Sequence, residues 1–90
     1  MRICVVGAGY VGLATAVMFG KLGHEVSIAE VDPARVKSVN SGKAPFYEPP
    51  LEAELAKLVN AGALKATTDT KSSVRDAKFV FICVQTPPLP

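Results

Sequence analysis

The motif G-A-G-Y-V-G at residues 7–12 constrains the fold of this chain more than any other feature. It follows an apolar run, residues 3–6, and precedes an apolar pattern with helical spacing. It therefore predicts a sharp turn from a buried strand into a helix. Glycine suits both ends of this turn. Gly7 can adopt backbone angles that other residues avoid, and Gly12 lets the helix pack close to the strand that it has left.

A second strand and an acidic residue extend the motif into a dinucleotide-binding pattern. Residues 25–30 form a strand-like run that ends in Glu30, 18 positions after Gly12. A carboxylate at this point can accept hydrogen bonds from both hydroxyls of an adenosine ribose. Because Gly9 has no Cβ, a pyrophosphate can approach the free N–H groups at the start of the helix. The candidate loop residues are Gly7, Ala8, Gly9, Tyr10, Val11 and Gly12.

Plainer interpretations of the same residues stay open. The loop could be a glycine-rich corner that binds nothing, and Glu30 could be a solvated strand end. Asp32 could be the ribose acid in place of Glu30. We prefer Glu30, because Asp32 directly precedes Pro33 and suits the N-cap of the next helix.

The remaining sequence alternates between strand and helix patterns. Strands are predicted over residues 2–6, 25–30, 64–67 and 78–84, and helices over residues 10–22, 33–40, 51–60 and 70–76. The apolar spacing of the first helix predicts a buried face of Val11, Ala14, Val17, Met18 and Leu22. Prolines exclude regular structure from residues 43–50.

Right-handed crossovers would place these strands in a parallel sheet of order 3-2-1-4. The expected fold class is therefore α/β, a doubly wound parallel sheet of the Rossmann type. A complete sheet of this type has about two further strands. We therefore expect residues 1–90 to be the N-terminal part of a larger dinucleotide-binding domain.

Composition narrows the range of partners. The net charge is only +2 and no Lys/Arg cluster occurs, which argues against a nucleic-acid partner. No apolar stretch is long enough to cross a membrane, and the first strand begins at once without a secretory pattern, so the expected compartment is the cytoplasm. Cys4 and Cys83 lie in apolar runs and are interpreted as packing residues. No spacing of ligand-type residues indicates a metal site.

Several short segments together resemble the opening of the UDP-glucose/GDP-mannose dehydrogenase family. They are R-I-C-V-V-G-A-G-Y-V-G-L at residues 2–13, G-H-E-V at 23–26, N-S-G-K at 40–43, Y-E-P at 47–49 and F-I-C-V-Q-T-P at 81–87. The resemblance covers the whole chain, and the Y-E-P segment favours members of the family that act on UDP-glucose. It implies an NAD-binding domain of an enzyme that oxidises the C6 alcohol of a sugar nucleotide to a carboxylate in two steps.

The resemblance also implies roles for individual residues. It places NAD contacts at Tyr10 and Val11, the ribose acid at Glu30, a basic residue near the adenosine at Arg35 and a crevice residue at Thr86. A carboxylate at position 30 would repel a 2′-phosphate, so NAD is favoured over NADP. Two residues depart from the family pattern. Glu30 stands where aspartate is usual, and Pro50 stands where glycine usually follows Y-E-P.

The resemblance places the catalytic cysteine and the sugar-nucleotide domain beyond residue 90. Neither cysteine of this chain matches the nucleophile's motif, so we expect no catalytic residue and no activity from the 90 residues alone. The roles of Tyr47 and Glu48 stay open between an acid/base pair and a rigid loop.

Two other function classes compete with the enzyme: a stand-alone module that binds NAD or another adenine nucleotide, and a non-binding domain that keeps the fold. The apolar run 79–84 would form a sheet edge, which predicts self-association unless the tail 87–90 shields that edge.

Overall fold

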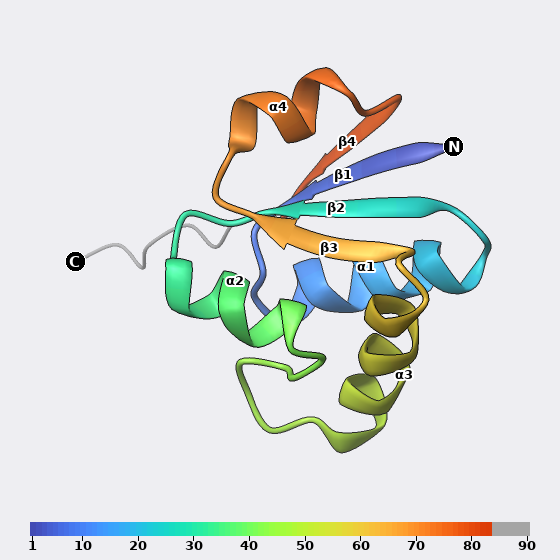
Figure 1. Ribbon diagram of the computed structural model, residues 1–90, viewed down its shortest axis with the longest axis vertical. Helices are drawn as coiled ribbons and strands as arrows, with labels where there is room; N and C mark the ends of the chain where they lie inside the picture. Colours follow the sequence, from blue (N-terminus) through green and yellow to red (C-terminus); the bar gives the residue numbers. More distant parts are fainter. Residues whose placement is uncertain (84–90) are drawn as a thin grey trace.

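A computed structural model of the protein describes residues 1–83, and residues 84–90 lie outside the description. Strands and helices alternate along the chain (Figure 1). The strands are β1 (Arg2–Val6), β2 (Glu25–Ala29), β3 (Leu64–Thr67) and β4 (Phe79–Ile82), and the helices are α1 (Tyr10–Lys21), α2 (Pro33–Asn40), α3 (Pro49–Asn60) and α4 (Thr70–Arg75).

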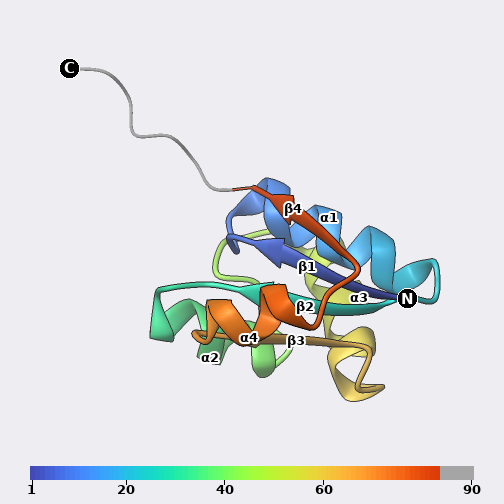
Figure 2. The same ribbon diagram turned by 90° about the horizontal axis from the view of Figure 1, so that it is seen from above.

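The four strands form one parallel sheet of order β3-β2-β1-β4, as predicted. Helices α1, α2 and α3 lie on one face of the sheet, and α4 lies on the other (Figures 1 and 2). Because all strands run in the same direction, the turn after β1 and the turn after β2 emerge side by side at one edge of the sheet. This edge is where open α/β sheets bind ligands.

Local sequence signals explain most helix ends. The Asp32 carboxylate accepts a hydrogen bond from Ala34 N at 2.9 Å, so it caps α2 as expected. Asp69 caps α4 in the same way through Ser72 N. Gly23 follows α1 with a φ of +96°, a left-handed conformation that ends a helix.

The prediction for residues 43–50 was wrong at its end, because α3 already begins at Pro49. Pro49 and Pro50 occupy the first turn of this helix. The N–H groups of a first turn have no partner within the helix, so proline is tolerated there. Strands β1 and β3 and helix α2 have the predicted bounds, and the other elements differ from the prediction by one or two residues at an end. The predicted strand 78–84 appears as β4, and its residue 84 lies outside the described part.

The core lies between the sheet and helices α1, α2 and α3. Strand residues Ile3, Val5, Val26 and Ile28 meet helix residues Leu13, Val17, Val39 and Leu55 in one buried cluster. The prediction of the buried face of α1 was right for Val17 and wrong for most of its other residues. The buried residues are Gly12, Leu13, Ala16, Val17 and Gly20, whereas Val11, Met18 and Leu22 are exposed.

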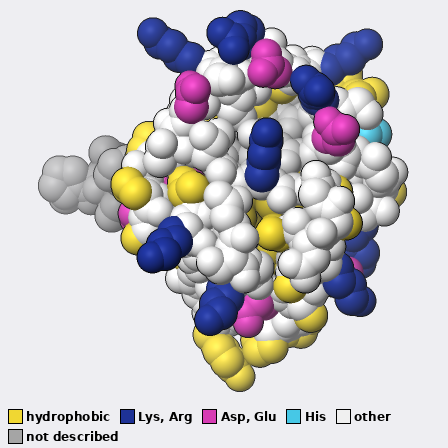
Figure 3. Space-filling model, in the orientation of Figure 1, with side chains coloured by type: hydrophobic (Ala, Val, Ile, Leu, Met, Phe, Trp, Pro, Cys, Tyr) yellow, Lys and Arg dark blue, Asp and Glu magenta, His cyan; other side chains and the backbone are white. Residues whose placement is uncertain are grey.

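The positive charges on one face of the molecule are spread out, as expected from a sequence without a Lys/Arg cluster. Lys and Arg side chains are scattered over the face drawn in Figure 3 rather than gathered. In the described part of the chain, no helix is long and apolar enough to span a membrane.

Candidate dinucleotide-binding site

The three glycines of the loop after β1 occupy different environments. Gly7 has a φ of +105° and donates its N–H to the Ala29 carbonyl at 2.8 Å, so it turns the chain while staying attached to β2. A Cβ on Gly12 would collide with the Gly7 carbonyl oxygen, so the close approach of α1 to the loop requires a glycine there. A Cβ on Gly9 would meet no atom of residues 1–83 within 4 Å. The fold therefore does not need a glycine at position 9, and the space beside it is open to a ligand.

Helix α1 begins without a side-chain cap. Gly9 is its N-cap residue, and the first turn contains no acidic residue. The first intrahelical bond runs from Leu13 N to the Gly9 carbonyl at 2.9 Å. The N–H groups of Tyr10, Val11 and Gly12 precede that bond and have no partner within the helix. Together with the helix dipole, these donors favour an anion in front of Gly9.

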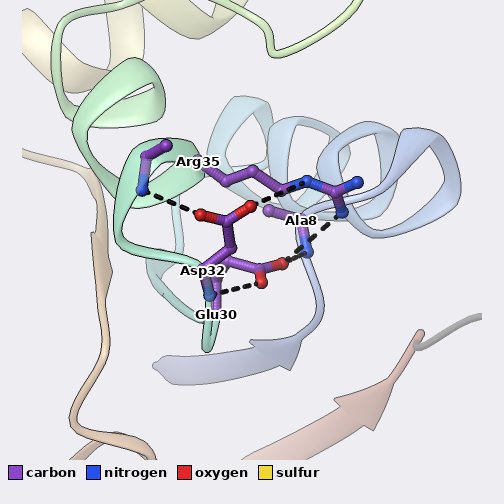
Figure 4. A network of polar contacts seen from close by, with 5 residues as sticks. Ala8, Glu30, Asp32 and Arg35 are labelled. Atoms are coloured by element: carbon purple, nitrogen blue, oxygen red, sulfur yellow. Dashed lines mark hydrogen bonds and ion pairs between the residues drawn. The ribbon is translucent and has the colours of Figure 1, made fainter.

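Glu30 is buried directly beside this loop, at the end of β2. Its side chain is only 8% exposed. Oε1 accepts the N–H of Ala8 at 2.8 Å, and Oε2 accepts the N–H of Asp32 at 2.9 Å (Figure 4). Each carboxylate oxygen has two acceptor positions, so one position on each oxygen stays available to a neighbouring hydroxyl pair. The carboxylate thus holds the loop in place and keeps acceptor capacity for a ligand.

Arg35 completes the network on the α2 side. Its guanidinium lies 3.9 Å from Glu30 Oε1 and 3.9 Å from Asp32 Oδ2, and about half of its side chain is exposed (Figure 4). Ion pairs at this distance and exposure are weak, because water screens them. The guanidinium is therefore free to rearrange toward a ligand at the edge of the site.

Tyr10 has a neighbour that the sequence did not reveal. Its ring lies 5.5 Å from the ring of Phe46, centroid to centroid. The segment that carries Phe46 is fixed at Ala44, whose N–H donates to the Glu52 carboxylate at 2.9 Å. The start of α1 is therefore braced by residues more than thirty positions away in the sequence. Tyr47, in contrast, is 93% exposed.

The structure brings most of the predicted site residues together. Residues 7–12 and Glu30 share one edge of the sheet, and Arg35 lies next to Glu30. The N–H of Ala8 is already bonded to Glu30, so Ala8 contributes to the position of the loop. Asp32 acts as a helix cap, which was our preferred interpretation of that residue. Thr86 lies outside the described residues.

The two cysteines do not form a site. Cys4 is buried with its Sγ 3.1 Å from Ser73 Oγ, and Cys83 packs against the core. Among residues 1–83, no group of His, Cys, Asp and Glu side chains is placed to hold a metal ion.

An extended dinucleotide fits these features. Its pyrophosphate would lie against Gly9 and the free N–H groups of α1, and its adenosine ribose would lie against Glu30. The fit depends on the open space beside Gly9 and on the two acceptor positions left on Glu30.

Comparison with known proteins gives one family. Residues 1–89 match the model of the UDP-glucose/GDP-mannose dehydrogenase family, NAD binding domain. The chain is 45% identical to the UDP-glucose 6-dehydrogenase of Pseudomonas aeruginosa over 87 residues, which are 97% of this chain and 19% of that protein.

Solved structures agree with the match. A GDP-mannose dehydrogenase from Pseudomonas aeruginosa, in a ternary complex, superposes with a TM-score of 0.92 at 44% identity and covers 97% of this chain and 20% of its own. A UDP-glucose dehydrogenase from Pyrobaculum islandicum also gives a TM-score of 0.92, at 37% identity, and covers 99% of this chain and 21% of its own. The chain thus spans about a fifth of the length of the relatives that it matches.

Proposed function

The chain belongs to the UDP-glucose/GDP-mannose dehydrogenase family as its NAD-binding domain, and we propose that the loop at residues 7–12 and Glu30 bind NAD directly. The observation that carries this proposal is the open space beside Gly9 in front of an uncapped helix. A glycine that the fold does not need, at the point where three N–H groups have no partner within the helix, is suited to the close approach of a pyrophosphate.

Glu30 provides the second half of the proposed site. Its two free acceptor positions suit the 2′- and 3′-hydroxyls of the adenosine ribose, which would donate to Oε1 and Oε2. A 2′-phosphate would instead place a second negative charge against this buried carboxylate, so NADP would bind more weakly than NAD. The half-exposed guanidinium of Arg35 would turn from Glu30 toward the adenosine and contact it. Thr86 is proposed as a contact on the crevice side.

We further propose that the full-length protein oxidises the C6 alcohol of UDP-glucose to the carboxylate of UDP-glucuronate with NAD, in the cytoplasm. The relative named as a UDP-glucose 6-dehydrogenase and the Y-E-P segment support this substrate. Relatives named as GDP-mannose 6-dehydrogenases are nearly as similar, at 44% identity. The coding sequence beyond Pro90 is the first check. It should continue into a glycine-rich segment with a cysteine, and a stop codon after Pro90 would contradict the whole-enzyme proposal.

Calorimetric titration of the 90-residue chain tests the binding proposal. NAD and ADP-ribose should bind with similar affinity, because the proposed contacts involve only the adenosine and pyrophosphate. The Gly9→Val variant should keep its thermal melting temperature, since a Cβ meets no atom there, and should lose NAD binding. Ala53→Val on the exposed side of α3 serves as the matched control. Unchanged NAD affinity in a folded Gly9→Val protein would refute the assignment of the loop.

A further inference from the structure

The segment that connects α2 to α3, residues 41–48, reaches the start of α1 (Figure 1). Its contact there is Phe46, whose ring lies 5.5 Å from the ring of Tyr10, with an angle of 47° between the two planes. Aromatic pairs are favourable at this distance and tilt. Phe46 also packs against the core, whereas 57% of Tyr10 is exposed. Phe46 therefore links the ring of an exposed residue to the interior of the fold.

The connecting segment is attached to both helices that it joins. On the α2 side, the N–H of Lys43 donates to the Ser38 carbonyl at 3.0 Å, and the Ser38 hydroxyl donates to the Lys43 carbonyl at 2.8 Å. On the α3 side, the N–H of Ala44 donates to the Glu52 carboxylate at 2.9 Å. The aromatic ring that meets α1 is thus carried by a piece of backbone that hydrogen bonds hold in place.

The first turn of α1 has few local restraints. Tyr10 is its first residue, and the preceding Gly9 has no side chain that could cap the helix or limit its own backbone angles. The peptide group between these two residues can therefore rotate at little cost, and the direction of the Tyr10 N–H changes with it. A tertiary contact on the Tyr10 ring supplies the restraint that the local sequence lacks.

We propose, on the basis of the NAD site proposed above, that Phe46 is a positioning residue for NAD and acts through Tyr10. Its ring holds the Tyr10 ring, so the N–H groups of Tyr10 and Val11 are directed toward the pyrophosphate before the ligand arrives. Donors that are already oriented need less ordering when the ligand binds. Phe46 therefore raises the affinity for NAD without a contact of its own to the ligand.

The other aromatic residue of the connecting segment does not share this role. Tyr47 directly follows Phe46 in the sequence, but 93% of Tyr47 is exposed. Phe46 packs against the core and against Tyr10. The positioning effect is therefore assigned to position 46 and not to the aromatic character of the segment as a whole.

Calorimetric titration of the 90-residue chain and its variants with NAD tests the proposal. Phe46→Leu keeps an apolar side chain against the core but removes the ring, so the NAD affinity should fall roughly threefold to tenfold, the range that corresponds to one aromatic pair. Phe19→Leu makes the same change near the other end of α1, where Phe19 packs against the core and against Phe81. It serves as the matched control and should leave the NAD affinity unchanged, with circular dichroism to verify that each variant is folded.

A double-mutant cycle distinguishes positioning from a general loss of stability. Because Phe46 acts through Tyr10, Phe46→Leu should have no further effect on NAD affinity when it is added to Tyr10→Leu. Adenosine has no phosphate, so it should bind equally well to the unchanged chain and to Phe46→Leu. Its binding can be followed by NMR at the Asp32 amide, which bonds to Glu30.

Three results would overturn the role of Phe46 while the proposed NAD site stands. They are equal NAD affinities of Phe46→Leu and the unchanged chain, equal losses in Phe46→Leu and Phe19→Leu, and independent effects of the Tyr10 and Phe46 substitutions. An equal loss of adenosine affinity in Phe46→Leu would also overturn it, because the effect would then not involve the pyrophosphate. If the unchanged chain bound no NAD, the NAD site itself would be refuted, and the role of Phe46 with it.

Discussion

At the scale of single residues, the G-x-G-x-x-G motif combines two kinds of requirement. Gly7 and Gly12 are fixed by the fold, the first by its positive φ and the second by the carbonyl that lies where its Cβ would be. A Cβ on Gly9 would contact no atom of the described residues, so the fold does not require a glycine there, and we propose that this glycine serves the ligand. A motif that is read as one unit in the sequence therefore separates into folding residues and a proposed binding residue.

This separation predicts opposite outcomes for two alanine variants. Gly12→Ala should lower the free energy of unfolding by about 2 kcal/mol or more, because α1 must move away from the Gly7 carbonyl. Gly9→Ala should change it by less than about 1 kcal/mol, as at an unconstrained surface position. Urea denaturation of both variants measures the difference, and equal losses would contradict the proposed division of roles.

Glu30 allows a second test at this scale. Glu30→Gln keeps the shape of the side chain but replaces one acceptor oxygen with an NH₂ group, which then faces the N–H of Ala8 or of Asp32. We expect a loss of about 2 kcal/mol in unfolding free energy and roughly tenfold weaker NAD binding, since hydrogen bonds to charged groups are worth about 1.5–3 kcal/mol.

The preference for NAD over NADP provides a further test of the proposed role of Glu30. The ratio of NAD to NADP affinity should fall in Glu30→Gln, because the charge that repels a 2′-phosphate is removed. Calorimetry with both nucleotides measures the ratio. Tighter binding of NADP than of NAD by the unchanged protein would disprove the proposed role of Glu30.

At the scale of elements, the sequence patterns predicted how helices begin and how the strands are ordered. The capping of α2 by Asp32 and the order of the strands in the sheet followed from the sequence and are confirmed. The buried face of α1 did not follow, because its larger apolar residues suggested the wrong side. Close packing against the sheet and α3 instead selects small residues, and a Cβ on Gly20 would lie 2.6 Å from Leu58. Apolar periodicity alone cannot detect a face that is buried because its residues are small.

The candidate site shows the same limit. The glycine spacing and the acid after β2 identified Glu30, and the structure places it beside the loop. The bonds from Ala8 and Asp32 to its carboxylate, and the packing of Phe46 on Tyr10, were not predictable. The Ala8 bond and the Tyr10–Phe46 packing join segments that are distant in the sequence, for which no local pattern exists, whereas the Asp32 bond spans only two residues and depends on the direction in which the Glu30 side chain points.

The corrected face of α1 predicts how two leucine variants differ. Leu13→Ala on α1 removes a fully buried side chain and should cost about 3 kcal/mol in unfolding free energy. Leu22→Ala, at the end of α1, should cost less than about 1 kcal/mol, because Leu22 is 67% exposed. The unfolding free energies of the two variants, measured by chemical denaturation, show which face of α1 is buried. A large loss in Leu22→Ala would restore the apolar face expected from the sequence.

At the scale of the whole molecule, we compare two places within residues 1–83 that offer polar groups to a nucleotide. One is the edge of the sheet formed by the loop after β1 and by Glu30. The other is a hollow of about 500 Å³ between α4 and the opposite face of the sheet, whose lining includes Ser27, Lys65 and Thr67. The edge, unlike the hollow, has a helix without a side-chain cap and a carboxylate with unused acceptor positions. We therefore propose that the cofactor binds at the edge.

The 90-residue chain should have no dehydrogenase activity by itself. The family resemblance places the nucleophilic cysteine outside residues 1–90, and Cys4 is buried against Ser73. Incubation with UDP-glucose and NAD should produce no NADH absorbance at 340 nm. Turnover that persists through purification and disappears in Cys4→Ala or Cys83→Ala would show that the chemistry lies in this chain.

The most direct test of NAD binding at the loop is an amide NMR titration of the 90-residue chain with NAD. We expect saturable shifts that are largest at Gly9, Tyr10, Val11 and Gly12, with a second group at the Ala8 and Asp32 amides that bond to Glu30. ADP-ribose should reproduce the same pattern. The absence of saturable shifts, or shifts centred on Ser27, Lys65 and Thr67 in the hollow beneath α4, would contradict it.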